Sequence, residues 1–199
     1  MSLLFETIKC SDGKLFNMEF HQARFEKANI EYFGIRSQIN LNEHIEIPEF
    51  AKTGLFRCRV TYSTQIEKIE FIPHQYRETK SLKLIEDNVI DYRFKFDDRE
   101  RLNLLFEKRG ICDDIIIVKN GCIADSFAAN LVFFDDKIWW TPDTPLLFGT
   151  QRTRLIKERK IFECKITLAN LKKFKQVGLI NAMQNLEMMP VIQFHHIQV

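Results

Sequence analysis

Short apolar stretches divided by turn residues make up the first third of the chain. Residues 1–9 and 14–16 flank Ser11-Asp12-Gly13, a turn sequence that predicts a hairpin. Apolar and polar positions then alternate through residues 55–63 and again through residues 66–72, which predicts two paired strands. We therefore expect a small sheet in this part of the chain.

A helix is expected between the two strand pairs. Asn17 can serve as its N-cap, and Gly34 provides a stop at its far end. Apolar residues recur at helical spacing between these two positions. His21 and Arg24 are three positions apart, so we expect their side chains to lie on one face of the helix.

The segment 74–79 is polar and has few apolar side chains, which favours a link between two lobes. An α+β lobe over residues 1–76 would then precede a β-rich lobe over residues 80–199. The apolar stretches that predict strands in the second lobe are residues 82–84, 115–118, 122–124, 131–134 and 138–140. The turns between the last four, such as Asn120-Gly121, are too short for crossovers, so an antiparallel meander is expected.

Two helices are also expected in the second lobe. Asp97 gives a capping-box signal for a helix that stops at Gly110, which puts Lys95 just ahead of a helix N-terminus. Thr150 is a suitable N-cap for a second helix over residues 151–160.

Composition places the chain among ordinary globular proteins. Its 199 residues suit one domain or two small ones, and 45% hydrophobic with 28% charged residues favours a buried core. Lys and Arg total 29 against 27 Asp and Glu, a balance that argues against a dedicated nucleic-acid binder. No stretch approaches about 18 uncharged apolar residues, and Glu6 and Lys9 come too early for a signal-peptide core. We expect a cytoplasmic protein without a membrane span.

Cysteine and histidine patterns predict no metal centre. The five cysteines show no CxxC spacing, which is typical of reduced, mostly buried thiols. His195 and His196 are adjacent in an expected strand, so they should point to opposite faces and could not hold one metal together.

Four positions carry candidate chemistry, each with an ordinary alternative. Lys95 lies in the aromatic segment YRFKF, where desolvation would lower its pKa as a Schiff-base lysine requires, unless its head extends into solvent. Asp125 lies beside small residues that would admit a planar ligand, although turns favour Asp for local reasons. The Gly149-Thr150-Gln151 helix start could bind a phosphate, as any capped helix could. Arg24 could donate to phosphate oxygens or stay solvated.

Several common catalytic signatures are missing from the sequence. It has no GxSxG, no P-loop, no HExxH and no GxGxxG. Hydrolase, NTPase, zinc-protease and dinucleotide-binding functions therefore lose their main support.

In combination, the weak signals resemble the class IV aminotransferase family of pyridoxal-phosphate (PLP) enzymes. The matching blocks are Phe5-Glu6-Thr7 with Asp12-Gly13-Lys14 and His21-x-x-Arg24, then Lys95, then Asp125 to Asn130, then Gly149-Thr150-Gln151-Arg152, and Pro190-Val191. They are similar to the family's FET, DGK and HxxR elements, its Schiff-base lysine, its acidic residue followed by Asn, its phosphate turn and its closing strand. The resemblance implies the α+β, two-lobe D-amino-acid aminotransferase-like fold (fold type IV), with a C-terminal lobe that binds PLP.

The resemblance also implies roles for single residues. Lys95 would attach the cofactor and then transfer protons, and Asp125 would keep the pyridine nitrogen protonated so that the ring accepts electrons. His21 would orient Arg24 or its loop. The remaining cofactor contacts would come from Arg24, Ala129, Thr150, Gln151, Asn181 and Ala182.

The sequence departs from the family pattern at several positions. Asp125 stands where most relatives carry Glu, Gln151 replaces Thr or Met, and Ala128 and Ala129 remove hydroxyl groups that many aminotransferases have. The strands that normally precede FET are missing, so the N-terminal lobe is expected to be truncated at its start, with part of the pocket absent or supplied by a partner subunit. Relatives are commonly dimers, which implies a homodimer.

Three details resemble aminodeoxychorismate lyase within this family: Lys95-x-x-Asp98-Arg99, Ala128-Ala129-Asn130-Leu131 and Asn181-Ala182-Met183. The favoured prediction is therefore a lyase that releases 4-aminobenzoate and pyruvate. Its hypothetical contacts to substrate carboxylates are Arg57, Arg59 and Tyr62. The alternatives are a D-amino-acid or branched-chain transaminase, and a PLP-binding homologue without catalytic activity.

Overall fold

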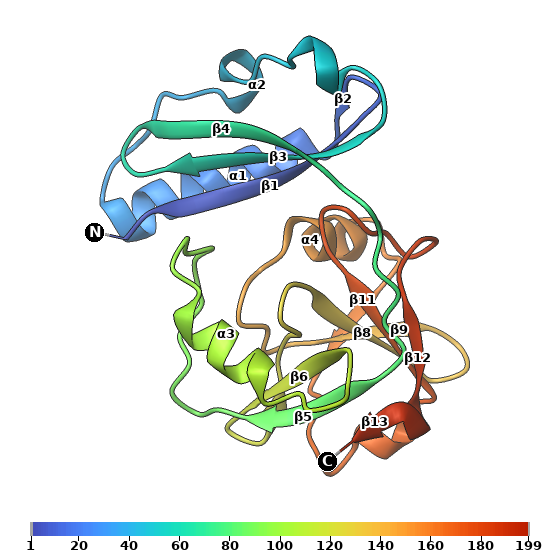
Figure 1. Cartoon of the computed structure of the whole chain (residues 1–199). Coiled ribbons are helices and arrows are strands. Elements are labelled where there is room, and N and C mark those ends of the chain that lie inside the picture. The colour runs from blue at the N-terminus through green and yellow to red at the C-terminus, as the bar shows by residue number, and fades with distance from the viewer. Residues whose placement is uncertain (1, 199) are drawn as a thin grey trace. The chain divides into compact units, whose positions relative to one another are not determined.

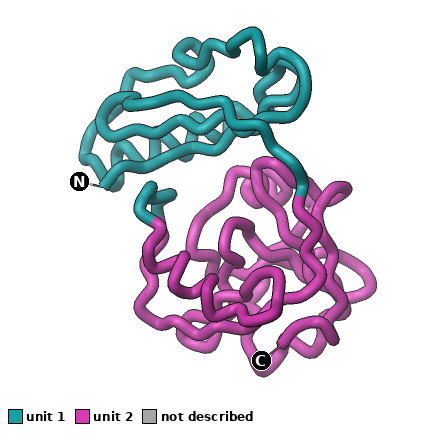
Figure 2. The backbone as a smooth tube through the Cα atoms, viewed as in Figure 1, with its two compact units in different colours: residues 1–76, 94–98 teal, residues 77–93, 99–199 magenta. Residues whose placement is uncertain are grey.

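The computed structural model describes residues 2–198, and the chain divides into two compact units (Figure 2). Unit 1 comprises residues 1–76 and 94–98, and unit 2 comprises residues 77–93 and 99–199. The sequence assigned residues 94–98 to the second lobe, whereas in the structure they pack with unit 1. Met1, which the first predicted strand included, lies outside the described residues.

Unit 1 contains a four-stranded antiparallel sheet in the order β2-β1-β3-β4. Its strands are β1 (Leu4–Ser11), β2 (Lys14–Leu15), β3 (Leu55–Tyr62) and β4 (Ile66–Pro73). Asp12 and Gly13 both have positive φ, 48° and 71°, as the tight turn between β1 and β2 requires. The predicted hairpin and strand pair are therefore present.

Helix α1 (Met18–Ala28) packs on one face of this sheet (Figure 1). Phe25 and Ala28 enter a buried cluster with Ile8, Val60 and other apolar residues of β1 and β3. The helix continues into a π-helical turn, η1 (Asn29–Phe33), and Gly34 ends it with φ at 73°. The short helices α2 (Leu41–His44) and η2 (Glu49–Ala51) follow before β3.

Unit 2 contains two sheets, in the orders β13-β5-β6-β7 and β10-β9-β8-β11-β12. The first sheet is built from β5 (Leu82–Glu86), β6 (Asp114–Lys119), β7 (Cys122–Ile123) and β13 (Ile197–Gln198). The second is built from β8 (Asn130–Phe134), β9 (Trp139–Pro142), β10 (Phe162–Cys164), β11 (Gln176–Ile180) and β12 (Val191–Gln193). The helices are α3 (Glu100–Glu107), α4 (Thr150–Lys157), η3 (Leu171–Lys173) and η4 (Phe194–His196). Buried residues of both sheets form one core cluster, which includes Ile116, Ile123, Phe133 and Leu179.

The predicted antiparallel meander is wrong in one respect. Strands β6 and β7 pair with each other, and β8 pairs with β9, but β7 and β8 belong to different sheets. Residues 124–129 leave the ladder and turn, and Asp125 forms a backbone bridge with Asn130. This turn carries the chain from one sheet to the other.

Two helix starts differ from the prediction. Arg99, not Asp97, occupies the N-cap of α3, because Asp97 forms an ion pair with Arg59 instead. Gly149 occupies the N-cap of α4, so Thr150 is the first residue of the helix. Each N-cap thus lies one or two residues from its predicted position.

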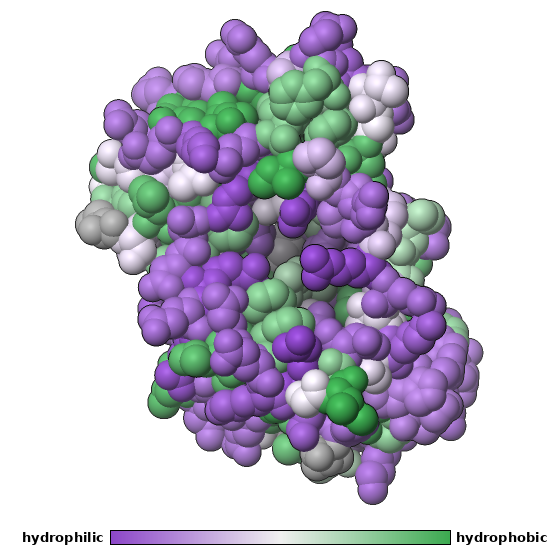
Figure 3. Space-filling model, in the orientation of Figure 1, coloured by the Kyte–Doolittle hydropathy of each residue, from purple (hydrophilic) through white to green (hydrophobic). Residues whose placement is uncertain are grey.

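His195 and His196 lie in the short helix η4 and not in a strand. Their ring centroids are 4.2 Å apart, so the prediction that they point to opposite faces is wrong. The tight helical turn replaces the alternation that a strand would impose. Within residues 2–198, no helix is long and apolar enough to cross a membrane, and the face in Figure 3 is largely hydrophilic with scattered apolar groups.

Candidate active site

Lys95 is held against the end of strand β1. The N–H of Phe5 donates to the carbonyl of Lys95 at 2.9 Å, and Leu4 forms a backbone bridge with Phe96. Phe94 and Phe96 pack against the core of unit 1, so the backbone on both sides of the lysine is anchored by partly buried rings. The Lys95 Nζ atom lies 4.6 Å from the centre of the Phe5 ring, a cation–π distance.

A buried charged cluster lies in the same unit, built from the FET and HxxR blocks. Arg24 donates from Nε to Glu6 Oε1 at 2.8 Å and from Nη2 to Glu6 Oε2 at 2.5 Å. His21 Nδ1 lies 2.5 Å from Glu6 Oε2. Glu6 and His21 have no exposed surface, whereas the Arg24 side chain is 15% exposed. As predicted, His21 and Arg24 share one helix face, and Glu6 joins them.

The environment fixes the charges in this cluster. Burial alone would raise the pKa of Glu6, but the neighbouring Arg24 and His21 outweigh it and lower that pKa to about 2. Burial lowers the pKa of His21, and the positive charges of Arg24 and Lys95 act in the same direction. Near neutral pH the cluster therefore pairs one carboxylate with one guanidinium, and the imidazole is neutral.

Strand β3 separates the three predicted substrate contacts. Arg57 is exposed and Arg59 is half-buried, and residues two apart in a strand share a face. The Arg59 guanidinium lies 3.7 Å from the centre of the Phe5 ring. Tyr62 points to the opposite face, where it is 1% exposed and packs against Phe25 with ring centroids 4.7 Å apart. The structure therefore brings Arg57 and Arg59 together and places Tyr62 in the core.

In unit 2, Asp125 is fixed by three hydrogen bonds. Asn130 Nδ2 donates to its Oδ1 at 2.7 Å, and the backbone N–H groups of Leu146 and Leu147 donate to its Oδ2 at 2.9 Å each. Only 5% of the residue is exposed. Burial raises the pKa of Asp125 to about 6, against the lowering effect of these hydrogen bonds and of Arg152.

The start of helix α4 is tied to the same turn. Asn130 Nδ2 also donates to the carbonyl of Leu147 at 2.8 Å. A Cβ atom on Gly149 would lie 2.0 Å from Asn130 Oδ1, so only glycine fits at this position. Thr150 and Gln151 are 3% and 2% exposed, so the first turn of the helix is buried. In the sequence, Asn130 is only the last residue of the Asp125 to Asn130 motif, and nothing there indicates that its side chain links Asp125 to the helix start.

The other predicted residues of unit 2 lie near this turn in the chain or in space. Asn181 Nδ2 is 3.4 Å from the carbonyl of Ala128, next to Ala129. Asn181 Oδ1 accepts from the backbone N–H groups of Met183 and Gln184, which shapes the turn that contains Ala182. Thus Asp125, Asn130, the 128–129 backbone and Asn181 form one connected set.

Arg99 is a further residue that the sequence did not assign to the site. Its Nη2 donates to the carbonyl of Phe127 at 2.6 Å, and its guanidinium lies 4.2 Å from the centre of that ring. Phe127 in turn stacks on Phe106 at 4.3 Å. Arg99 therefore holds the turn between Asp125 and Asn130. In the sequence, only the pattern Lys95-x-x-Asp98-Arg99 pointed to this residue.

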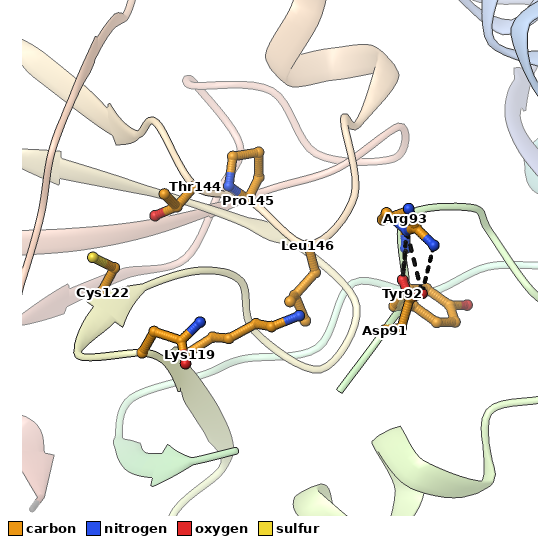
Figure 4. A pocket seen from close by; sticks show the side chains of 9 residues that line it. Asp91, Tyr92, Arg93, Lys119, Cys122, Thr144, Pro145 and Leu146 are labelled. Atoms are coloured by element: carbon orange, nitrogen blue, oxygen red, sulfur yellow. Dashed lines mark hydrogen bonds and ion pairs between the residues drawn. The ribbon is translucent and has the colours of Figure 1, made fainter. Parts of the chain in front are cut away.

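A separate cavity of about 290 Å³ in unit 2 contains none of the predicted site residues (Figure 4). Its cationic groups are engaged: Lys119 Nζ donates to the carbonyl of Ile90 at 2.5 Å, and Arg93 pairs with Asp91. The backbone of Leu146, which lines this cavity, is the group that binds Asp125. The cavity is thus a neighbour of the Asp125 turn.

Comparison with known proteins identifies the family. A family model described as amino-transferase class IV matches residues 3–194, so the chain belongs to the class IV aminotransferase family. A protein of Haemophilus influenzae strain Rd without an assigned function is 39% identical over 186 residues, which are 92% of this chain and 98% of its own. The chain is accordingly a PLP-dependent enzyme of the lyase or aminotransferase type.

Solved structures agree with this assignment. A candidate 4-amino-4-deoxychorismate lyase from Haemophilus somnus 129PT is 34% identical, with a TM-score of 0.88 over 94% of this chain and 98% of that one. The PLP-bound form of a hypothetical aminotransferase from Mycobacterium tuberculosis is 15% identical, with a TM-score of 0.80 over 98% of this chain and 81% of that one. The predicted fold type IV is therefore confirmed.

Proposed function

We propose that this enzyme is an aminodeoxychorismate lyase, which converts its substrate into 4-aminobenzoate and pyruvate. The observation that carries the proposal is the Asp125 turn. A buried carboxyl group is held by Asn130 and two backbone N–H groups, next to the Ala128-Ala129-Asn130-Leu131 segment that resembles the lyases. The 34% identity to the candidate lyase from H. somnus supports the same substrate.

The residues of the Asp125 turn fit PLP. A carboxylate offers about four acceptor positions, and Asn130, Leu146 and Leu147 occupy three of those on Asp125. One position on Oδ1 remains for a protonated ring nitrogen. The contacts that would hold the cofactor are Arg24, Lys95, Asp125, Ala129, Thr150, Gln151, Asn181 and Ala182.

Different residues of this chain have separate roles in the proposed reaction. When bound, PLP supplies a ring that accepts the electrons released at the substrate carbon. Lys95 Nζ would bind the cofactor covalently and, once the substrate's amino group has replaced it there, the released amine would take the proton from the substrate carbon that bears the nitrogen. Asp125 would keep the ring nitrogen protonated. Arg57 and Arg59, on one face of β3, bind substrate carboxylates. We further propose a cytoplasmic homodimer, in which the first lobe of each chain is residues 1–76 with 94–98 and the second lobe is the rest.

A product assay tests the proposal. The holoenzyme is incubated with aminodeoxychorismate, and 4-aminobenzoate and pyruvate are identified by mass spectrometry. A second reaction contains a panel of D- and L-amino acids with 2-oxoglutarate. We expect both lyase products and no keto acid from the panel; keto acids without lyase products would identify a transaminase, and neither would indicate a PLP-binding protein without turnover.

The role of Lys95 has its own test. Borohydride reduction of the holoenzyme followed by peptide mapping should label Lys95, and the visible absorption of the bound cofactor should be lost in Lys95→Ala. Lys119→Ala is a suitable control, because Lys119 lies in unit 2 and is bound to Ile90. Labelling of a lysine other than Lys95 would contradict the assignment.

A further inference from the structure

Glu6 is buried at the base of Arg24, and no role follows for it from the chemistry above. We propose that Glu6 is a positioning residue that holds the Arg24 guanidinium in the orientation needed to bind the cofactor phosphate. This inference rests on the proposed function, in which Arg24 is a phosphate ligand. It assigns a role to Glu6, a residue that takes no part in the reaction proposed above.

The geometry of the pair supports positioning. Glu6 accepts from two different nitrogens of Arg24, at 2.8 and 2.5 Å, so the planar guanidinium is fixed in direction as well as in place. An arginine has five N–H donors, and these two bonds direct Nε and Nη2 inward. The Arg24 side chain is 15% exposed while Glu6 has no exposed surface, so the guanidinium lies on the outer side of the pair.

Glu6 is itself rigidly held. It lies on β1, where its partner in the ladder is Val60 of β3, and the adjacent Phe5 N–H donates to the carbonyl of Lys95 at 2.9 Å. His21 Nδ1 lies 2.5 Å from the same Oε2 atom, and because the ionised carboxylate can only accept, Nδ1 acts as the donor. Strand and helix therefore both define where the carboxylate can be.

Charge provides a second reason for Glu6. Arg24 and Lys95 are both cationic, and both lower the pKa of the nearby His21. A mostly buried guanidinium without a counter-charge would leave its position for water, because an unpaired buried charge is strongly disfavoured. In Glu6→Gln the side chain keeps its size but loses its charge, and an amide has only one acceptor oxygen in place of the two that Arg24 binds. Arg24 should then lose its orientation.

The test compares PLP with pyridoxal, which lacks the phosphate. Dissociation constants for both are measured by absorbance with the full chain freed of cofactor, as wild type and as Glu6→Gln. We expect Glu6→Gln to weaken PLP binding by about ten- to a hundredfold, as loss of a charged hydrogen-bond pair implies, and to change pyridoxal binding little. Equal loss for both compounds, or no loss, would overturn the positioning role.

Two further variants sharpen the result. Asp87→Asn removes another buried carboxylate with two bonds to one arginine, at 2.9 and 2.8 Å from Arg101, and should leave the PLP-to-pyridoxal ratio unchanged. Glu6→Asp keeps the charge, which favours folding, but is too short to keep both bonds; an unchanged ratio there would also contradict the proposal. A wild-type chain that binds PLP no better than pyridoxal would overturn the proposed role of Arg24 itself.

Discussion

Asp125 illustrates, at the scale of a single residue, how a functional group can oppose stability. The carboxyl group is almost fully buried, and burial raises its pKa to about 6 even though three hydrogen bonds favour the charged form. Ionisation of this group is therefore costlier in the folded chain than in solution when no ring nitrogen is bound. A bound pyridinium would supply the missing counter-charge.

The free energy of unfolding of the cofactor-free chain should therefore depend on pH through Asp125. Because the pKa of Asp125 is raised on folding, the protonated group favours the folded state below its ordinary value of 3.8, and this contribution is lost as pH rises through about 6. The loss amounts to about 3 kcal/mol for a shift of this size. Urea unfolding between pH 4 and pH 7 should show that Asp125→Asn gains stability relative to wild type as pH rises.

Asp113 provides a control of opposite sign. Hydrogen bonds from Lys80 and Ser81 lower the pKa of Asp113, so its contribution to stability is present above 3.8 and is lost at lower pH. Asp113→Asn should therefore lose stability relative to wild type as pH rises towards 3.8, and the difference should stay constant between pH 4 and pH 7. A common trend in both variants would show that the pH effect does not arise at Asp125.

At the scale of elements, strand β3 divides its side chains by alternation. Arg59 and Arg57 lie on one face, and Tyr62 packs into the core on the other. Burial strongly raises the pKa of Tyr62, as expected for a phenol in apolar surroundings. Of the three proposed substrate contacts, only the arginines lie on the face of β3 that points away from the core.

Steady-state kinetics of the lyase reaction should separate these residues. Arg59→Gln should raise KM by about tenfold, since a charged hydrogen bond to a carboxylate is lost. Tyr62→Phe should leave KM near the wild-type value, because it keeps the ring that packs on Phe25. A large KM effect of Tyr62→Phe would mean that the hydroxyl group contacts substrate after all.

The connection between the Asp125 turn and helix α4 depends on a glycine for space and not for backbone freedom. Gly149 has φ of −66°, which any residue adopts, but its Cβ position is filled by the Asn130 amide. Gly34 has the reverse character, with a positive φ of 73° and no atom within 4 Å of its Cβ position.

Gly149→Ala should therefore displace Asn130 and release Asp125. We expect a loss of about 2 kcal/mol in the free energy of unfolding from overpacking, together with weaker PLP binding. Gly34→Ala should cost about 1 kcal/mol through its left-handed backbone and leave PLP binding unchanged. Urea unfolding and cofactor titration of both variants test this contrast, and normal PLP affinity in Gly149→Ala would contradict it.

For the molecule as a whole, cofactor binding should be visible as stabilisation. A ligand that binds only the folded state adds about 2.7 kcal/mol at a hundredfold excess over its dissociation constant. PLP should thus raise the Tm of the wild-type chain clearly, and that of Lys95→Ala much less because covalent attachment is lost. Equal shifts in both, measured by calorimetry, would argue against attachment at Lys95.

Much of the protein was predictable from the sequence because local chemistry decided it. The hairpin at Asp12-Gly13, the helix that carries His21 and Arg24, and the family's spaced motifs all depend on turn residues, periodicity or residue order. Tertiary packing decided the rest. Glu6 became the partner of Arg24, Asn130 became the support of Asp125, and residues 94–98 joined unit 1, because contacts between residues far apart in the chain leave no periodic pattern. Helix starts and the path between the two sheets of unit 2 were likewise set by ion pairs and turns that form only in the folded chain.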